Sequence, residues 1–344
     1  MSLRTRRLGA TGPELTTVGF GAWAIGGPWK YGWGEVDDDE SITAVRHAID
    51  SGVNWVDTAA NYGLGHSEEI VGRALAPYRP GEDLYVATKC GRSWYGRPEG
   101  VIENDLRPAS IRYECEQSLR RLGVERIDLY QIHMPDSRTG TPLEESWGTM
   151  AELVEEGKAR WIGVSNFDVE QLERCEAVRH VDSVQPPLSL LARGTLSTVI
   201  NWAREHGTGV VVYSPMASGM LAGAFDRARV DALTPDDFRR QLPLFQEPLL
   251  SRSLDLVPRL RVIADELGTT LPALAVAWAL AQPGVTAAIV GARLPRHVDG
   301  WLPASELELD ERLLAEIADA IAKTGAGTDE PPVLPTHLRP PEPA

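Results

Sequence analysis

The sequence predicts an α/β fold, a single (β/α)8 TIM barrel with an N-terminal hairpin and long loops at the C-terminal face. Eight short β-rich segments alternate with segments that carry apolar residues every three or four positions, a pattern typical of parallel βαβ units. The 344 residues exceed the usual length of one domain, but barrels of this class run to about 250 residues or more as one unit. The helical stripes alone would also fit a doubly wound open sheet, and the count of eight strands favours the barrel.

The predicted elements begin with a short hairpin. Arg6–Leu8 and Leu15–Thr17 flank a turn at Gly9–Gly12, and we expect this hairpin to plug the barrel floor. Eight barrel strands are then predicted in chain order, at Val18–Trp23, Asn54–Thr58, Leu84–Lys89, Leu129–His133, Trp161–Ser165, Ser183–Gln185, Val210–Tyr213 and Ala287–Val290.

Helix signals lie between these strands. Asp168 is a typical N-cap, and Pro108 is typical of the first turn of a helix. Three apolar stripes have helical spacing: Ile42, Val45 and Ile49; Ile111, Cys115, Leu119 and Leu122; and Leu254, Val257, Leu260 and Leu267.

Two segments are too long for an ordinary strand-to-helix turn. Cys90–Arg107 follows the third strand and Ser214–Ser253 follows the seventh, where barrels of this class keep their chemistry. We expect the second loop, which carries Arg239 and Arg240, to close over a bound cofactor. The barrel domain is predicted over residues 1–323, and residues 324–344 form a proline-rich tail whose last part is predicted to be disordered.

Composition and charge exclude several classes of protein. Acidic residues outnumber basic ones by 49 to 34. A net charge of −15 would repel nucleic acid and anionic membranes, so a general binder of either is disfavoured. The three cysteines form no CxxC pair, which speaks against a disulfide framework or a zinc knuckle. The longest apolar run, Ala273–Ala281, is too short to span a bilayer, and Arg4, Arg6 and Arg7 precede no signal-like apolar stretch. We therefore expect a cytoplasmic protein.

Ionisable side chains fall at the ends of three neighbouring strands. Asp57, Lys89 and His133 each end a predicted strand, and Tyr62 lies on the loop after Asp57. A single Lys or His at a strand end is more often an exposed cap, but four such groups at one face indicate an acid–base site. Lys89, held by Asp57, is expected to lower the pKa of the Tyr62 phenol, and His133 to donate to a carbonyl oxygen. Such a site can protonate an alkoxide but supplies no hydride, so a cofactor is required.

The sequence carries none of the common nucleotide- or metal-binding motifs: no GxGxxG after a strand, no GxxxxGK[ST] and no HExxH. A Rossmann dehydrogenase, a P-loop NTPase and a zincin are therefore disfavoured. A metal-dependent barrel hydrolase or isomerase would need clustered histidine and carboxylate ligands, and no metal site is predicted.

The strand-end motifs resemble the signature of the aldo-keto reductase family. They read Asn54-Trp-Val-Asp57-Thr-Ala-Ala-Asn-Tyr62-Gly63, Ala87-Thr-Lys89, Asp128-Leu-Tyr-Gln-Ile-His133 and Gly163-Val-Ser165-Asn166-Phe167, in matching order over nearly the whole chain. Tyr213-Ser-Pro-Met216 and Gly291-Ala-Arg293 are most similar to the branch that contains bacterial enzymes and potassium-channel β-subunits.

The resemblance implies a (β/α)8 barrel that binds NADPH across its mouth, with NADH the less favoured cofactor. It implies that Tyr62 is the general acid, that Lys89 and Asp57 tune it, and that His133 orients the carbonyl. Ser165, Asn166 and Gln185 would bind the nicotinamide carboxamide, Tyr213 would stack on its ring, and Arg293 would approach the 2′-phosphate. The remaining implied cofactor residues are Gly21, Trp23, Ser214, Pro215, Met216, Gly219, Leu221, Gly291 and His297.

The chain also departs from the family pattern. Gly300 and Trp301 stand where Glu and Asn usually contact adenine, which leaves the preference between NADPH and NADH open. Arg296 and His297 occupy positions where Glu and Gln or Arg are frequent. Met134 replaces the tryptophan that often follows the histidine, so that pocket wall is expected to be smaller and softer.

Aromatic residues crowd the expected substrate side, which favours aromatic or other bulky aldehydes and ketones. The predicted pocket walls are Trp23, Trp29, Trp33, Trp94 and Met134. The leading hypothesis is an NADPH-dependent reductase of small-molecule carbonyl compounds by direct hydride transfer. The alternative is a nucleotide-binding regulatory barrel with little turnover. The sequence does not predict the physiological substrate, the direction of flux or the oligomeric state.

Overall fold

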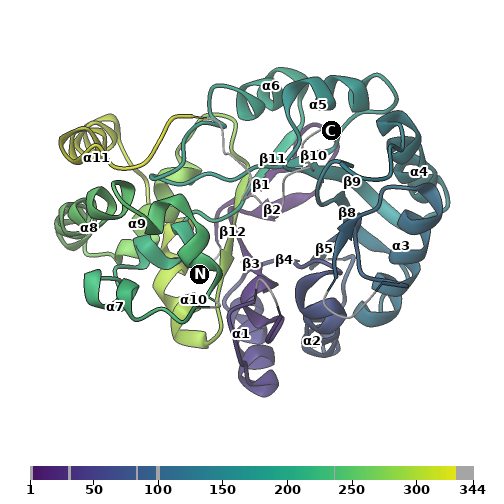
Figure 1. The fold of residues 1–344 in the computed structure, drawn as a ribbon, viewed down its shortest axis with the longest axis horizontal. Helices are drawn as coiled ribbons and strands as arrows, with labels where there is room; N and C mark the ends of the chain where they lie inside the picture. The colour runs from purple at the N-terminus through teal and green to yellow at the C-terminus, as the bar shows by residue number, and fades with distance from the viewer. Residues whose placement is uncertain (1–2, 30–31, 83, 98–100, 236, 331–344) are drawn as a thin grey trace.

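Eight parallel strands close into a barrel in the computed structural model (Figure 1). The structure describes residues 3–29, 32–82, 84–97, 101–235 and 237–330. The strand order around the barrel is β10-β11-β12-β3-β4-β5-β8-β9, so all eight predicted strands are present and the predicted (β/α)8 barrel is confirmed. The strands are β3 (Val18–Gly21), β4 (Trp55–Asp57), β5 (Tyr85–Cys90), β8 (Ile127–Ile132), β9 (Ala159–Ser165), β10 (Ser183–Gln185), β11 (Gly209–Val212) and β12 (Ala287–Gly291).

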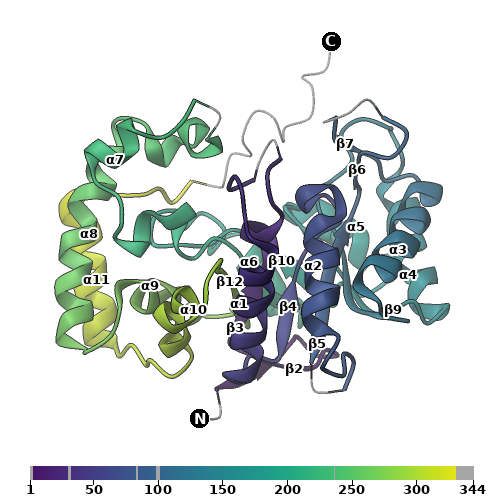
Figure 2. The ribbon, with the colours of Figure 1, turned by 90° about the horizontal axis from the view of Figure 1, so that it is seen from below.

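The N-terminal hairpin closes one end of the barrel. Strands β1 (Thr5–Arg7) and β2 (Glu14–Thr16) pair antiparallel, close to the predicted positions. Leu8 and Leu15 are buried in a cluster with Trp55 and other inward-facing residues, and the Trp55 Nε1 donates to the Thr16 carbonyl at 2.8 Å. Figure 2 shows β2 at the end opposite β6 (Arg92–Ser93), β7 (Glu103–Asn104) and α7 (Arg227–Asp231). The chemistry expected at the C-terminal ends of the strands therefore lies at the other end.

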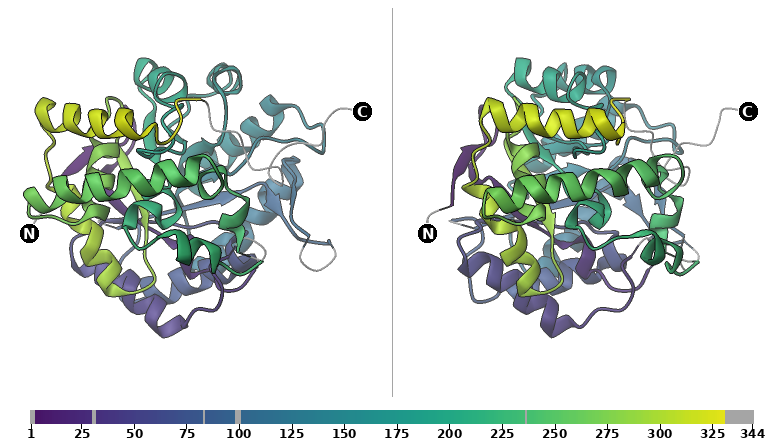
Figure 3. Two further views of the ribbon diagram at one scale, coloured as in Figure 1. Left: turned by 60° about the vertical axis from the view of Figure 1, so that its left-hand side comes forward. Right: turned by 90° about the vertical axis from the view of Figure 1, so that its left-hand side faces the viewer.

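Helices surround the barrel, and each predicted stripe lies on one of them, except that Leu267 of the third stripe caps the end of its helix. Ile42 and Val45 lie on the buried face of α1. The Asp168 side chain forms a capping box with Gln171 at the start of α5. The helices are α1 (Asp38–Asp50), α2 (His66–Leu75), α3 (Pro108–Leu122), α4 (Leu143–Glu155), α5 (Val169–Glu176), α6 (Val199–His206), α8 (Leu249–Glu266), α9 (Leu271–Leu280), α10 (Pro295–Trp301) and α11 (Glu311–Thr324). Helices α8 and α11 pack side by side, as Figure 3 shows.

Both long loops contain structure of their own. The loop after β5 holds the short pair β6 (Arg92–Ser93) and β7 (Glu103–Asn104). The loop after β11 holds η3 (Ala217–Ala222), α7 (Arg227–Asp231), η4 (Phe238–Gln241) and η5 (Pro243–Phe245). Helix α8 begins at Leu249, inside the range predicted as loop, because the first apolar residue of its buried face is Leu250.

The C-terminal segment returns toward the strand ends. Residues 325–330 follow α11, and Thr328 bridges to Ala192 in the segment after β10 while Arg193 pairs with Asp329 at 2.7 Å. The part of the tail predicted to be disordered falls largely on residues 331–344, which lie outside the described residues. Within the described ranges no single helix has the length and apolarity of a membrane span, although α8 and α9 would pass together as a pair bent by 90°.

Candidate active site

Four ionisable side chains meet at the C-terminal end of the barrel, as the sequence predicts. Asp57 ends β4, Lys89 lies in β5, His133 follows β8, and Tyr62 begins the turn η2 (Tyr62–Gly65). The Lys89 Nζ lies 2.5 Å from the Asp57 Oδ1 and 5.2 Å from the centroid of the Tyr62 ring. The Tyr62 and His133 rings meet edge to face with centroids 5.6 Å apart. These four residues are called the strand-end cluster below.

Close backbone packing fixes the position of Tyr62 in the cluster. Gly63 has a left-handed backbone with φ of 61°, and a Cβ built there would lie 1.8 Å from the Gly26 carbonyl oxygen. Only glycine fits at that contact, which fixes the Tyr62 turn against the loop after β3. Two loops far apart in sequence thus determine where the phenol lies.

The Asp57–Lys89 pair is almost completely buried. The side-chain exposure is 3% for Asp57 and 0% for Lys89, and the Lys89 Nζ also donates to the Thr58 carbonyl at 2.8 Å. Burial lowers the pKa of Lys89, while the Asp57 carboxylate acts in the opposite direction. The short contact with Asp57 and the Thr58 bond hold the ammonium beneath the Tyr62 ring.

The pKa of Tyr62 differs from the sequence expectation. Although part of the side chain is exposed, the surrounding protein raises the pKa of Tyr62 well above its ordinary value, and the Asp57 charge adds to this shift. Lys89 was expected to lower it, but the ammonium faces the ring, and burial outweighs the basic groups nearby. Tyr62 therefore keeps its proton at neutral pH, as a proton donor must.

His133 is held in its neutral form. Burial, together with the positive charges of Lys89 and Arg92, lowers the pKa of His133 well below its usual range. Its backbone N–H donates to the Cys90 carbonyl at 3.0 Å, and its carbonyl accepts from the Asn166 Nδ2 at 3.0 Å. Its Nδ1 is buried with no hydrogen-bond partner among the described residues. A neutral imidazole carries one N–H, so this ring can donate one hydrogen bond.

Three of the four residues predicted to contact the nicotinamide, its carboxamide or its ring, form a connected group beside His133. The Tyr213 hydroxyl donates to the Asn166 Oδ1 at 2.7 Å, and the Asn166 Nδ2 donates to the Ser165 Oγ at 3.0 Å. Asn166 has a left-handed φ of 63°. Because an asparagine tolerates this backbone better than most residues, the side chain is turned into the mouth at modest cost. Gln185, the fourth predicted residue, points into the barrel and contacts Asp57.

The loop that follows Tyr213 turns through several residues with a left-handed backbone. Ser214, Ala217 and Ser218 have φ between 49° and 56°, and Gly219 has a φ of 91°. The Ala217 and Gly219 N–H groups donate within the loop, to the Ser214 and Met216 carbonyls at 2.9 and 3.1 Å, so an anion would have to be bound by other N–H groups of this loop. Leu221 is fully buried, so its side chain belongs to the core, and only its backbone can face a ligand.

Arg293 lies where β12 ends, but its guanidinium is engaged. Its Nη2 donates to the Glu35 carbonyl at 2.6 Å and its Nη1 to the Trp33 carbonyl at 3.5 Å, while the His297 Nδ1 accepts from its backbone N–H. Gly21 and Gly291 pair across β3 and β12 at the same end. Trp301 is 1% exposed, so its indole belongs to the core and does not take the place of the family's asparagine.

Aromatic rings cover one side of the cluster. The Trp23 and Trp29 rings lie 6.5 and 6.3 Å from the Tyr62 ring, and Trp33 packs on Trp23 at 5.7 Å. Phe238 in η4 adds a ring 5.0 Å from Trp23, a residue that the sequence reading missed. The Arg239 guanidinium lies 4.9 Å from the Trp33 ring. The loop after β11 therefore reaches across the mouth to the loop after β3.

The other two predicted wall residues differ in placement. Trp94 stacks on Tyr95 at 4.4 Å, with the Arg121 guanidinium 5.7 Å from its ring. Met134 is 2% exposed, next to His133. The roles of Trp94 and Met134 as walls of the substrate pocket stay predictions. The contact of Trp94 with Arg121 of α3 favours a packing role for its ring.

A buried carboxyl group that contacts the backbone at Gly91 was also missed. Glu114 on α3 is 0% exposed and accepts from the Gly91 backbone N–H at 3.2 Å and from Ser110 at 3.2 Å. Burial raises the pKa of Glu114 to about 8, and the negative charges of Asp105 and Glu68 act in the same direction. The signal for it was a glutamate in line with the apolar stripe of Ile111 and Cys115.

The raised pKa of Glu114 predicts a stability effect. Between the ordinary pKa of 4.5 and the raised value of about 8, the folded state binds one more proton than the unfolded state. Relative to Glu114→Gln, the wild-type free energy of unfolding should therefore fall by roughly 1.4 kcal/mol per pH unit as the pH rises through this window. Urea unfolding of both proteins at pH 5 and pH 8 measures the difference, and a pH-independent difference would contradict the buried neutral carboxyl.

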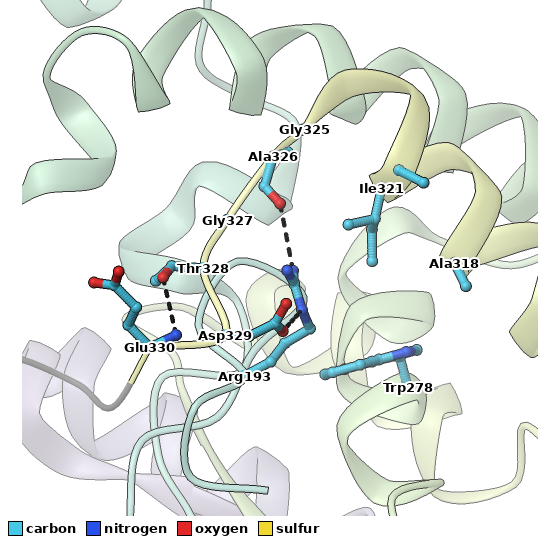
Figure 4. A pocket seen from close by; sticks show the side chains of 11 residues that line it. Arg193, Trp278, Ala318, Ile321, Gly325, Ala326, Gly327, Thr328, Asp329 and Glu330 are labelled. Atoms are coloured by element: carbon cyan, nitrogen blue, oxygen red, sulfur yellow. Dashed lines mark hydrogen bonds and ion pairs between the residues drawn. The ribbon is translucent and has the colours of Figure 1, made fainter. Parts of the chain in front are cut away.

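An open groove lies elsewhere, away from the strand-end cluster. It has a volume of about 890 Å³ and is lined by Arg193, Trp278, residues of α11 and the segment Gly325–Glu330 (Figure 4). It contains none of the predicted site residues, and the Arg193–Asp329 pair occupies one side of it. In the part of the chain that the structure describes, no three His, Cys, Asp or Glu side chains are grouped to hold a metal ion.

Comparison with known proteins gives a consistent family. The model of the aldo/keto reductase family matches residues 17–322. The aldo-keto reductase YhdN of Bacillus subtilis is 36% identical over 338 residues, 96% of each chain. The NADH-specific methylglyoxal reductase of Escherichia coli is 32% identical over 329 residues, 92% of this chain and 98% of its own.

Solved structures agree with the sequence comparison. The glycerol dehydrogenase AKR11B4 from Gluconobacter oxydans superposes with a TM-score of 0.85 and 38% identity, covering 97% of this chain and 100% of its own. The holo form of the aldo-keto reductase AKR11C1 from Bacillus halodurans gives a TM-score of 0.76 and 25% identity over 98% of this chain and 100% of its own.

Proposed function

Since this chain belongs to the aldo/keto reductase family, an NAD(P)H-dependent group of oxidoreductases, we propose that it reduces aldehydes or ketones to alcohols with Tyr62 as general acid. The observation that carries the proposal is the strand-end cluster, in which the Tyr62 ring lies within 6 Å of both the Lys89 ammonium and the His133 ring. NADPH, when bound, supplies the hydride. The residues of the chain bind the cofactor, orient the carbonyl group and protonate its oxygen.

Each residue of the cluster has a role that follows from its state. Tyr62 keeps its proton at neutral pH and gives it to the carbonyl oxygen as negative charge develops there. Neutral His133 donates a hydrogen bond that fixes the same oxygen next to the phenol. Lys89 stabilises the phenolate left behind, and Asp57 keeps the ammonium in place.

The residues present fit a nicotinamide cofactor at the mouth. Ser165, Asn166 and Tyr213 offer a linked polar group beside His133, and the left-handed turn at residues 214–219 suits a pyrophosphate. Asn166 would exchange a bond to Tyr213 or Ser165 for one to the carboxamide. The closed loop after β11, with Phe238 and Arg239 on the aromatic wall, supports its predicted place over the cofactor.

NADPH is the proposed cofactor because Arg293 is the basic residue at the expected phosphate end. Its guanidinium has five N–H donors, so the bonds to Trp33 and Glu35 leave donors that can reach a 2′-phosphate. A relative is named as NADH-specific, and that name makes the comparison of the two cofactors necessary. The neutral Gly300 and buried Trp301 are proposed to weaken adenine contacts equally for both.

Arg293→Ala separates the two cofactors. Loss of a charge-assisted contact with phosphate should raise the KM for NADPH roughly 10- to 100-fold, while the KM for NADH changes little. The exposed Arg259 on α8 provides the control, because Arg259→Ala removes the same charge far from the mouth. Equal loss of affinity for both cofactors in Arg293→Ala would argue against phosphate recognition by this residue.

The substrate is proposed to be an aromatic or otherwise bulky carbonyl compound. It would bind between the strand-end cluster and the rings of Trp23, Trp29 and Trp33. NADPH consumption with a panel of aldehydes and ketones tests this, and bulky aromatic aldehydes should give the highest kcat/KM. Binding of NADPH without turnover on any of them would instead favour the regulatory alternative.

We also propose a cytoplasmic protein whose barrel spans residues 1–323, without nucleic-acid or membrane partners, in keeping with the charge of −15.

A further inference from the structure

A buried hydrogen-bond network lies inside the barrel beneath the strand-end cluster. It joins Asp57 of β4, Gln131 of β8 and Gln185 of β10, which are 2%, 0% and 3% exposed. The Gln185 Nε2 lies 3.0 Å from the Asp57 Oδ2 and 3.1 Å from the Gln131 Oε1, and the Gln131 Nε2 lies 3.3 Å from the Asp57 Oδ2. None of these three strands neighbours another in the barrel, so the contacts cross its interior.

The donors and acceptors fix how both amides face. The Asp57 carboxylate only accepts, and its Oδ1 is taken by the Lys89 ammonium. Both glutamines must therefore turn an NH2 group toward the Oδ2. The second N–H of Gln185 then goes to the Gln131 Oε1, which leaves the Gln185 Oε1 on the side of the amide away from Asp57.

The orientation of Gln185 matters for the proposed cofactor site. An outward Oε1 is an acceptor, and the NH2 group of a nicotinamide carboxamide is a donor. If the Gln185 amide turned over, its oxygen would face the Asp57 carboxylate, and its NH2 would face the NH2 of the ligand. Both contacts would be repulsive. The Gln131 Oε1 accepts a hydrogen bond from the Gln185 NH2 only in the first orientation, and therefore stabilises that orientation.

Gln131 is also tied to the proton-donor side. It lies two residues before His133, on the same face of β8, and it pairs in register with Lys89 of β5. Its bond to Asp57 fixes the carboxylate oxygen that does not touch Lys89. One buried side chain thus contacts both Gln185, the proposed cofactor residue, and Asp57, the partner of the Lys89 ammonium.

We propose that Gln131 is a positioning residue that couples cofactor binding to the Asp57–Lys89 pair by fixing the amide of Gln185 and the carboxylate of Asp57. The proposal rests on the proposed function. Gln131 touches neither substrate nor cofactor, and acts through Gln185 and Asp57. A residue with a purely structural role would affect stability without changing cofactor affinity or the pH profile.

Two variants test the coupling. Gln131→Leu removes both bonds at similar volume and should raise the dissociation constant for NADPH roughly tenfold, because the Gln185 amide loses its fixed orientation in a buried site. Gln131→Glu keeps the shape but places a second carboxyl beside Asp57, and two such groups share one proton. The single-turnover rate of carbonyl reduction should then acquire a new ionisation, with the rate falling as the pH rises through it.

The control is Tyr130→Phe, on the same strand. Tyr130 is fully buried, its hydroxyl faces Ile111 on α3, and it makes no contact with Asp57 or Gln185 in the described part of the chain. This variant should bind NADPH and respond to pH as wild type does. Thermal unfolding of every variant reports whether it is folded, and the near-isosteric Gln131→Glu keeps the test available if Gln131→Leu does not fold.

The outcomes separate this inference from the proposed function. Wild-type affinity and a wild-type pH profile in both Gln131 variants would overturn the positioning role while leaving the reductase proposal intact. A wild-type protein that binds NADPH but reduces no carbonyl would overturn the reductase proposal, and the NADPH affinity of Gln131→Leu would still decide whether Gln131 acts on the cofactor site. A wild-type protein that binds neither NADPH nor NADH would overturn both.

Discussion

Tyr62→Phe should lower the single-turnover rate of aldehyde reduction by about 10²- to 10⁴-fold, the usual contribution of a positioned general acid. The variant removes only the hydroxyl and keeps the ring that packs between His133, Trp23 and Trp29. NADPH affinity should therefore stay within a few-fold of wild type. Stopped-flow measurement of NADPH oxidation, together with a fluorescence titration, reports the two quantities separately.

The matched control is again Tyr130→Phe, which removes a buried phenol hydroxyl that faces α3 rather than the mouth. It should leave the rate of reduction unchanged. A Tyr62→Phe protein that keeps more than a tenth of the wild-type rate would show that the proton comes from another group. The neutral His133 would then be the first alternative to examine.

Lys89→Met should have the second largest effect, on both stability and turnover. The ammonium and the Asp57 carboxylate are buried together, and removal of one partner leaves an uncompensated charge in the interior. Breaking a buried pair in this way costs about 3–5 kcal/mol of unfolding free energy. Denaturant unfolding measures this loss, and the rate of reduction should fall because no cation remains to stabilise the phenolate.

A double variant separates the charge effect from loss of packing. Asp57→Asn combined with Lys89→Met leaves no unpaired charge, so it should unfold at higher denaturant concentration than Lys89→Met alone. Its activity should stay low, since the ammonium is still missing. Equal stability of the single and double variants would mean that Asp57 is not buried as a charged group next to Lys89.

The sequence predicted the barrel and its reactive end because both follow from local rules. Strand-end placement of Asp57, Lys89 and His133 needs only the period of each strand and the fact that parallel strands deliver their ends to one face. The hairpin floor follows equally from the turn at Gly9–Gly12 between two short β-rich segments. These features depend on residues close together in the chain.

What the sequence did not predict depends on closure across the barrel. Gln131 is a single polar residue inside an apolar strand, and only the closed lumen brings it to Asp57 and Gln185, on strands that are not its neighbours. Phe238 reaches Trp23 through a long loop whose path no periodicity fixes. The raised pKa of Tyr62 likewise reflects burial, which is a property of the packed site and not of the spacing between charged residues.

This barrel is proposed to transfer a hydride from NADPH to a carbonyl carbon while Tyr62 supplies the proton. The proposed transfer is tested most directly with NADPH deuterated at both C4 positions and an aromatic aldehyde, with mass spectrometry of the alcohol. One deuterium is expected on the former carbonyl carbon, with at least a hundredfold slower labelling in Tyr62→Phe. An unlabelled alcohol, or labelling that proceeds at the wild-type rate without the Tyr62 hydroxyl, would contradict it.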